Sequence, residues 1–264
     1  MDLEKLNYIK SDILKEEWIK RPYSEAFCGL YVDGTGKLTF DLANASFHAF
    51  KVYSKYDYPV YLFVAINNNP TEIEKIVQKY PNTKVYSIPQ LKTPLEYNEW
   101  MLHHPWFLIS PKFERIFSFQ EDGALISKGW ENYFIKGNWD YVGSPWRSDI
   151  TVLSKNGPLK TLRVGNGGIS LRKRSSIIKV VDYIHKNGGQ HQFFTGIKIN
   201  DELKQSNSWL NEDAMICSVG ATFDLLKLPT LEEARKFGHE PIELSLYMDK
   251  NNIDRPYCFH KVDF

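Results

Sequence analysis

Residues 115–122, Arg-Ile-Phe-Ser-Phe-Gln-Glu-Asp, begin as an apolar run and end abruptly in polar and acidic side chains. A run this short, rich in β-branched and aromatic residues, predicts a buried strand. Open α/β sheets bind ligands in the crevice outside the carboxyl ends of their strands. Asp122 follows this strand directly, so it is the first candidate for a metal ligand. On this stretch alone, a solvated acidic turn after a core strand is the simpler interpretation.

The composition is ordinary for a soluble globular protein and disfavours several classes of function. The chain has 264 residues, which is enough for one large α/β domain or two small ones. A net charge of +1 gives no global field toward nucleic acid or an anionic membrane, so we expect no nucleic-acid partner. The three cysteines, Cys28, Cys217 and Cys258, are widely spaced, which argues against both a disulfide framework and a structural zinc site.

The hydropathy of the chain bears on its location in the cell. The first residues, MDLEKLNYIKSDILKEEW, are charged and lack the apolar core of a signal peptide. No stretch of the sequence approaches the length of a membrane span. With cysteines that suit a reducing compartment, the sequence predicts a cytoplasmic protein without a transmembrane segment.

Strand and helix signals alternate before the opening stretch. Residues 58–66 are an apolar run typical of a buried strand, and residues 84–88 predict a second strand. Between them, a helix capped by Thr71 is expected to reach about Tyr80. This order indicates a right-handed parallel crossover.

The N-terminal part of the sequence gives weaker signals. Residues 1–20 have the spacing of a helix with one apolar face. Residues 22–58 look irregular, and the Asp-Gly-Thr-Gly at 33–36 is interpreted as a hairpin turn because no Lys-Ser/Thr follows it as in a phosphate loop. Further along, the adjacent His103 and His104 are expected to be structural or surface residues, since neighbouring helix positions do not face each other.

The sequence beyond the opening stretch predicts a further set of elements. They are a strand at 139–143, a loop at 147–160, a strand ending near Arg172, a helix capped by Ser175 and ending near His185, a flexible polar excursion at 186–208, a helix starting at Glu212, and a short polar helix at 231–237.

Three groups of residues in this half could carry chemistry. Glu212 and Asp213 begin a helix, where carboxylates complement the macrodipole by about 0.3–1 kcal/mol, or where one of them acts as a general base. Glycines 165, 167 and 168 allow close backbone approach to a ligand or form a tight turn, and Asn166 adds an amide between them. His260 and Lys261 would suit a diphosphate with a bound divalent ion, although a lone tail histidine is more often a surface residue.

Six motifs in order carry a resemblance to a known family. They are Phe-Gln-x-Asp at 119–122, Trp-Asp-Tyr-Val-Gly-x-Pro-Trp at 139–146, Gly-Asn-Gly-Gly-Ile-Ser-Leu-Arg at 165–172, Glu-Asp at 212–213, Leu-Pro-x-x-Glu-Glu-Ala-x-x-Phe at 228–237, and Phe-His-Lys at 259–261. Over residues 58–261 the chain resembles a little-characterised family of glycosyltransferase-like proteins, similar to the GT-A class of nucleotide-sugar enzymes.

The resemblance implies an architecture and a reaction. It implies a GT-A-like α/β domain at 58–264, with a Rossmann-type, mostly parallel sheet flanked by helices, and an N-terminal helix and irregular extension at 1–57 packed on that core. It further implies a hexosyltransferase-like enzyme of glycan biosynthesis that uses Mn²⁺ or Mg²⁺. Such an enzyme takes its sugar from a nucleoside-diphosphate donor and passes it to the hydroxyl of a glycan or another acceptor.

The resemblance also implies roles for particular residues, which divide between the two substrates. Gln120, Glu121 and Asp122 replace the Asp-x-Asp motif that holds metal and donor, and an amide at Gln120 would bind metal weakly. The remaining roles are metal binding by Asp122 and His260, diphosphate binding by Lys261, an inverting catalytic base at Asp213 or Glu212, and an acceptor side formed by Trp146, Gly165, Asn166, Gly167 and Gly168.

Several alternatives stay open on the sequence. Gln120 in place of an acid favours a non-catalytic nucleotide-sugar or glycan-binding module. A metal-dependent phosphoesterase using Asp122, Asp213 and His260 would need more clustered ligands per metal. Trp146 could pack on an acceptor sugar or in the core, and Arg172 could reach a phosphate or form an ion pair.

Overall fold

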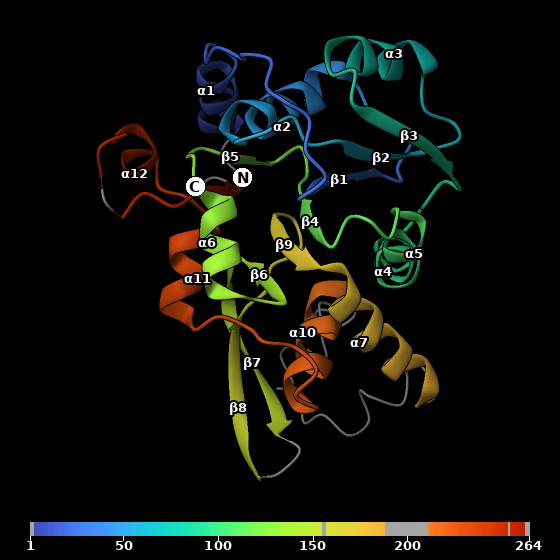
Figure 1. Cartoon of the computed structure of the whole chain (residues 1–264), viewed down its shortest axis with the longest axis vertical. Helices are drawn as coiled ribbons and strands as arrows, with labels where there is room; N and C mark the ends of the chain where they lie inside the picture. The colour runs from blue at the N-terminus through green and yellow to red at the C-terminus, as the bar shows by residue number, and fades with distance from the viewer. Residues whose placement is uncertain (1–2, 155–156, 188–210, 253, 262–264) are drawn as a thin grey trace.

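The computed structural model describes residues 3–154, 157–187, 211–252 and 254–261. In these residues a central sheet of six strands has the order β3-β2-β1-β4-β9-β6 (Figure 1). The first four strands are parallel, and β9 runs antiparallel to both β4 and β6. The predicted α/β fold with a mostly parallel sheet flanked by helices is therefore confirmed. The strands are β1 (Cys28–Asp33), β2 (Val60–Ala65), β3 (Thr83–Ile88), β4 (Arg115–Ser118), β6 (Tyr141–Gly143) and β9 (Ser170–Lys173).

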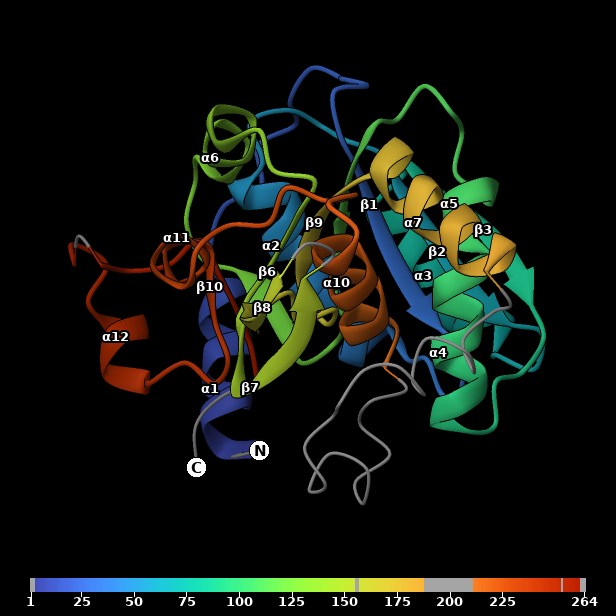
Figure 2. The same cartoon turned by 90° about the horizontal axis from the view of Figure 1, so that it is seen from below.

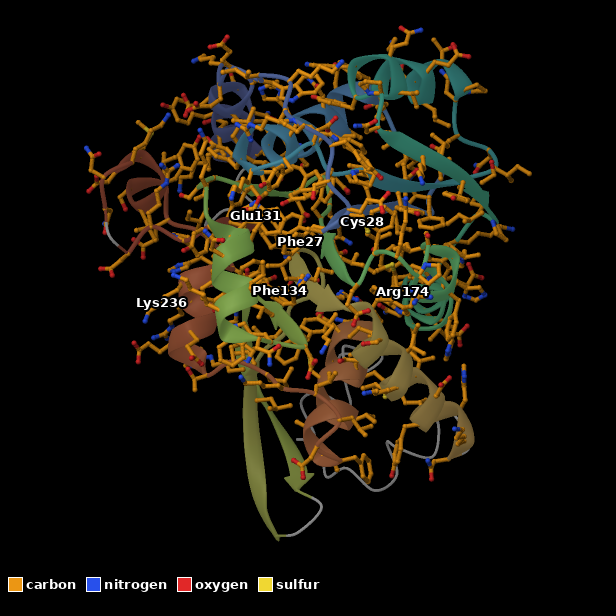
Figure 3. All side chains as sticks on the ribbon, in the orientation of Figure 1. Phe27, Cys28, Glu131, Phe134, Arg174 and Lys236 are labelled. Carbon is orange, nitrogen blue, oxygen red and sulfur yellow. The ribbon has the colours of Figure 1, made fainter. Side chains whose placement is uncertain are left out.

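Two apolar cores lie on the two faces of this sheet, because successive residues of a strand point to opposite sides. One core contains side chains from α1 (Leu3–Ile13), α2 (Phe40–Tyr53), α3 (Pro70–Lys79) and α6 (Trp130–Gly137). Its aromatic rings include Phe27 and Phe134, whose centroids are 6.3 Å apart (Figure 3). The other core contains side chains from α4 (Pro94–His103), α5 (Pro105–Leu108), α7 (Arg174–Lys186) and α10 (Glu212–Thr222), which gather on the opposite side in Figure 2.

The prediction that residues 22–58 are irregular is wrong. They contain β1, an inner strand between β2 and β4, and α2, whose N-cap Thr39 accepts a hydrogen bond from the Leu42 amide. Every residue from Ala43 to Tyr53 is buried, so α2 lacks the amphipathic period that would have marked it. The segment at 33–36 is likewise not a hairpin turn but the connection from β1 to α2. Since β1 belongs to the central sheet, we propose that the α/β domain begins before residue 28 rather than at 58.

The predicted loop at 147–160 also needs correction. A two-stranded antiparallel hairpin of β7 (Pro145–Ser154) and β8 (Gly157–Val164) occupies it and projects from the body of the molecule (Figure 1). The pairing shifts register between Pro145 and Ile150. Such irregular pairing weakens the period-two signal by which strands are recognised in a sequence.

Helix boundaries differ from the predicted ones at three points. Helix α1 ends at Ile13 rather than near residue 20, Asn69 instead of Thr71 caps α3, and α7 begins at Arg174, with Lys173 rather than Ser175 at the N-cap. The predicted start of α10 at Glu212 and the extent of α11 (Leu231–Phe237) are confirmed, and Thr230 and Glu233 form a capping box for α11. Most of the predicted excursion at 186–208 lies outside the described residues.

A small second sheet joins the last described residues to β5 (Gly123–Leu125), which follows β4 in the chain. Strand β11 (Cys258–His260) pairs antiparallel with β5 (Gly123–Leu125) and parallel with β10 (Gly238–His239), which α12 (Leu244–Met248) follows. In this register His260 lies opposite Gly123, and the Lys261 amide donates to the Asp122 carbonyl at 2.8 Å. The tail is thereby fixed beside the turn after β4. No described helix is long and apolar enough to cross a membrane.

Candidate active site

A cleft of about 490 Å³ opens at the carboxyl ends of β1 and β4, where an open α/β sheet places its ligands. Segments far apart in the sequence line it: the turns after these two strands, the start of α4, the glycine loop before β9, the start of α10 and the end of β11. Of the predicted site residues, the cleft is lined by Gln120, Glu121, Asp122, Asn166, Gly167, Gly168, Glu212, Asp213, His260 and Lys261. Trp146 and Gly165, which were also predicted to belong to the site, do not line the cleft.

Asp122 and His260 form the closest pair of predicted metal ligands. Asp122 Oδ1 lies 3.1 Å from His260 Nε2, and the imidazole is buried, with 4% of its residue surface exposed. Although the two atoms are this close, neither makes a hydrogen bond of good geometry with any described residue. Buried polar atoms normally have such partners. Two unsatisfied ligand atoms that face each other are therefore a feature to be explained.

The carboxylates around His260 control its charge. Burial alone would lower the pKa of His260, but its contacts with Asp122 and Glu240 outweigh burial and raise that pKa to about 9. Burial likewise acts to raise the pKa of Asp122, yet the contact with His260 prevails and lowers it. Without a metal, the pair is thus an imidazolium against a carboxylate, and a cation taking the place of the proton would find both ligand atoms in position.

The separation of these ligands suits a divalent cation. Ligands at about 2.1 Å from Mg²⁺, at right angles to each other, are about 3 Å apart. Among the described residues no group of three or more His, Cys, Asp or Glu could hold a metal. Asp122 and His260 would therefore supply two ligands, and the others would come from water and substrate, as is common for Mg²⁺ at phosphates. With that division of ligands, the residues fit a divalent cation bound together with a diphosphate.

Glu240 lies next to His260 on the side away from Asp122, and it gives no signal in the sequence. Its Oε1 lies 3.4 Å from His260 Nδ1 and 3.6 Å from Lys261 Nζ, and its Oε2 accepts a hydrogen bond from Asn166 Nδ2. A carboxylate on the second nitrogen of a ligating histidine orients the ring and raises its basicity. Glu240 thus links the tail residues to the glycine loop.

Glu212 is held by a buried ion pair. Its Oε1 lies 2.8 Å from an Nη of Arg172, which is fully buried between the rings of Trp106 and Tyr141. Of the two roles that the sequence left open for Arg172, the core ion pair is the one observed. The Glu212 amide donates to Asn98 Oδ1 at 3.3 Å, so α4 also fixes the start of α10. Glu212 is therefore committed to internal partners.

Asp213, next along the helix, is buried and keeps a side facing the cleft. Its Oδ2 accepts hydrogen bonds from the Gly167 amide at 2.7 Å and from Trp146 Nε1 at 3.2 Å. Burial, together with the neighbouring charge of Glu212, raises the pKa of Asp213 to about 7, although these hydrogen bonds oppose the rise. A carboxylate with this pKa can take a proton near neutral pH, as a general base must.

The glycine loop packs against both halves of the site. A Cβ at Gly168 would lie 2.0 Å from His260 Nε2, and a Cβ at Gly167 would lie 2.5 Å from Glu212 Oε1. At Gly165, φ is +122° and a Cβ would meet Cys217 Sγ at 2.4 Å. The sequence predicted that these glycines allow close approach of the backbone to a ligand. In the structure the backbone at Gly167 and Gly168 closely approaches two candidate site residues, Glu212 and His260.

The remaining part of the cleft contains residues that the sequence analysis missed or placed only loosely. Gln120 Nε2 donates to the Tyr97 hydroxyl at 2.8 Å, so this amide is turned toward α4. Asp33, at the end of β1, accepts hydrogen bonds from Thr35 and from Asn68 Nδ2. The signal that could have marked Asp33 is the acid after a short apolar run, but that run was not recognised as a strand.

The protein is thus of the α/β class, with a mixed, mostly parallel sheet and a cleft lined by polar residues at the strand ends. The chain belongs to the family described as "Protein of unknown function (DUF5672)", whose model matches residues 82–260, within the residues 58–261 over which the resemblance extends. Among curated proteins no relative matches.

Several solved structures resemble this chain at low similarity. The mannosyltransferase Ktr4p from S. cerevisiae is 8% identical, with a TM-score of 0.47, over 83% of this chain and 75% of that one. A 4-diphosphocytidyl-2C-methyl-D-erythritol synthase from Anaerococcus prevotii is 11% identical, with a TM-score of 0.41, over 64% and 81%. GalNAc-T7, solved with UDP, GalNAc and Mn²⁺, is 9% identical, with a TM-score of 0.41, over 59% of this chain and only 36% of its own. These values concern the fold alone.

Proposed function

We propose that this protein is a metal-dependent glycosyltransferase that moves a sugar from a nucleoside-diphosphate sugar to a hydroxyl acceptor with inversion. One observation carries the proposal. One cleft holds the buried Asp122–His260 pair and a lysine on one side, and a buried carboxylate with a raised pKa on the other. Transfer from a diphosphate donor needs both: charge stabilisation on the leaving group and a base for the acceptor.

The donor side would bind and stabilise the diphosphate. A divalent cation held by Asp122 and His260 would supply Lewis-acid stabilisation of the negative charge that develops there. Lys261, whose side chain is 45% exposed, extends an ammonium group beside this pair that can donate to phosphate oxygens. Glu240 holds the imidazole from behind, so that its other nitrogen stays directed at Asp122.

The acceptor side would activate the hydroxyl. Asp213 takes the hydroxyl proton, the acceptor oxygen bonds to the anomeric carbon, and the bond from that carbon to the diphosphate breaks on the opposite face. Glu212 is the weaker candidate for the base because its charge is already paired with Arg172. The amide of Gly167 and the indole of Trp146 fix the orientation of the Asp213 carboxylate.

A panel of nucleoside-diphosphate sugars tests this proposal. In thermal-shift measurements with Mn²⁺, at least one donor should raise the melting temperature, and the shift should shrink when EDTA removes the metal. That donor should then be turned over when candidate acceptors are supplied. Stabilisation by no donor would contradict the proposal.

A non-catalytic nucleotide-sugar-binding module is the second candidate. The observation that favours it is Gln120, whose amide replaces an acid and is hydrogen-bonded to Tyr97 rather than directed at a cation. Donor hydrolysis separates the two candidates. Slow Mn²⁺-dependent release of nucleoside diphosphate during a long incubation supports the enzyme, and tight binding without any release supports the module.

A further inference from the structure

A second pocket lies one layer of side chains away from the candidate base. It has a volume of about 250 Å³ and is lined by Pro145, Trp146, Arg163, Arg235 and residues 238–241, and we refer to it as the arginine pocket. Trp146 lines this pocket while its Nε1 donates to Asp213 Oδ2. Glu240 lines it while its carboxylate contacts His260. A ligand in the arginine pocket would therefore touch the back of two side chains that shape the active site.

Two arginine side chains line this pocket. Arg235 is exposed in the last turn of α11, and Arg163 extends from β8, where its Nε donates to the Trp146 carbonyl at 3.3 Å. Glu240, the carboxylate among the lining residues that the structure describes, directs its oxygens toward Asn166, His260 and Lys261 on the cleft side, where they contact two cationic side chains. Guanidinium groups in this arrangement favour an oxyanion ligand.

The position and size of the pocket point to the acceptor rather than to the donor. Neither arginine lines the cleft that would hold the diphosphate. A volume of about 250 Å³ is below the roughly 300–1,000 Å³ of most small-molecule sites, so the pocket would hold only part of a substrate. The indole of Trp146 and the two prolines add apolar surface of the kind on which sugar rings pack.

We propose that the arginine pocket binds an anionic substituent, a carboxylate or a phosphate, of the acceptor whose hydroxyl reaches Asp213. Arg235 is then a specificity-determining residue that selects acidic acceptors, and Trp146 separates the bound anion from the reacting hydroxyl. This inference rests on the proposed glycosyltransferase function, because it names the class of the second substrate.

Direct binding to the whole chain tests the inference without requiring turnover. The probes are glucuronate for a carboxylate, glucose 6-phosphate for a phosphate, and glucose as the uncharged control, each titrated by calorimetry or by NMR. We expect one anionic probe to bind at least about tenfold more tightly than glucose, since hydrogen bonds to charged groups are stronger than hydrogen bonds between neutral groups. The tighter of the two anions identifies the substituent.

The variants are chosen so that only the pocket changes. Arg235→Gln should lower the affinity for the anionic probe about tenfold. Arg235→Lys, which keeps the charge but not the planar guanidinium group, should lower that affinity less. Lys236→Gln is the matched control. It removes the same charge one position along, from the outer side of α11, where Lys236 pairs with Glu232 and lines no part of the pocket (Figure 3). Equal affinity in Arg235→Gln and Lys236→Gln would overturn the inference, and so would glucose binding as tightly as the anions.

Donor binding with Mn²⁺, measured on the same samples, separates the two proposals. Every variant should retain it, because Arg235 lies outside the cleft. If the wild-type protein binds donor but no anionic probe, only the acceptor inference fails. If it binds the anion through Arg235 but no donor, the proposed function fails and the arginine pocket remains an anion site.

Discussion

His260 Nε2, on β11 near the end of the chain, lies 3.1 Å from Asp122 Oδ1, in the turn after β4. The pairing of β11 with β5 creates this contact, because it aligns His260 with Gly123. Two buried ligand atoms thus face each other without satisfying each other. A cation that takes the place of the imidazolium proton would bind both atoms directly, which is a physical reason to expect metal binding here.

The first prediction concerns this pair of ligands. Asp122→Asn and His260→Ala should each lower the affinity for Mn²⁺ in the presence of a nucleoside diphosphate. Loss of an outer-sphere partner alone costs about 10–100-fold in metal affinity, so loss of a ligand should cost at least about that much. Electron paramagnetic resonance of free Mn²⁺ measures the change. Glu25→Gln, far from the cleft and paired with Lys112, serves as a control that should bind normally.

The second prediction concerns Gly168. A methyl group there would lie 2.0 Å from His260 Nε2, so Gly168→Ala should displace the imidazole and weaken Mn²⁺ binding as His260→Ala does. Gly129→Ala is the matched control, since φ at Gly129 is +98° but the added Cβ meets only Tyr257, at 3.6 Å. That control should lose about 1–2 kcal/mol of stability from backbone strain without any change in metal affinity. Normal Mn²⁺ binding by Gly168→Ala would argue against a metal site at His260.

The third prediction concerns pH. Burial and the charge of Glu212 raise the pKa of Asp213 to about 7, so the carboxylate is protonated and inactive as a base below that pH. Transfer should therefore increase as the pH rises through about 7. Trp146→Phe removes a hydrogen bond that lowers this pKa, so the rising limb should move to higher pH. If wild type and Trp146→Phe have identical pH–rate profiles, the ionisation of Asp213 does not control the rate.

The fourth prediction concerns the buried ion pair behind the site. Arg172→Met leaves Glu212 buried without its counter-ion and should reduce the free energy of unfolding by about 3–5 kcal/mol. The double variant Arg172→Met/Glu212→Gln removes the stranded charge and should recover part of the loss. Urea denaturation followed by fluorescence measures both. A single-variant loss below about 1 kcal/mol would show that Glu212 finds another partner.

The sequence predicted those parts of the fold that have a periodic or composite signal. The apolar runs of β2 and β4 are buried parallel strands, and continuous apolar character is what such strands require. In contrast, α2 is buried on all sides from Ala43 to Tyr53 and so lacks an amphipathic period. Because this helix was not predicted, the strand–helix order that would have indicated β1 was not recognised either. The β7/β8 hairpin was missed because its sequence is polar and its register irregular.

The candidate site could be predicted only where charge follows a recognised element. Asp122 and Asp213 were found because an acid at a strand end or a helix start has a physical interpretation. His260 was a candidate because it precedes a lysine in the tail, and the order of motifs supported it. Glu240 and Asn98 act through contacts with residues far away in the sequence, to His260 and to the Glu212 amide. Such contacts are determined by tertiary packing and leave no local pattern.

In the proposed reaction, Asp213 removes the proton from the acceptor hydroxyl, in the same cleft that binds the donor. The most direct test of this claim compares wild type with Asp213→Asn, measuring donor affinity by calorimetry with Mn²⁺ and transfer by product formation. We predict unchanged donor affinity and a fall in kcat of about 10²–10⁴-fold, the usual contribution of a general base. Near-normal turnover in Asp213→Asn would contradict the claim.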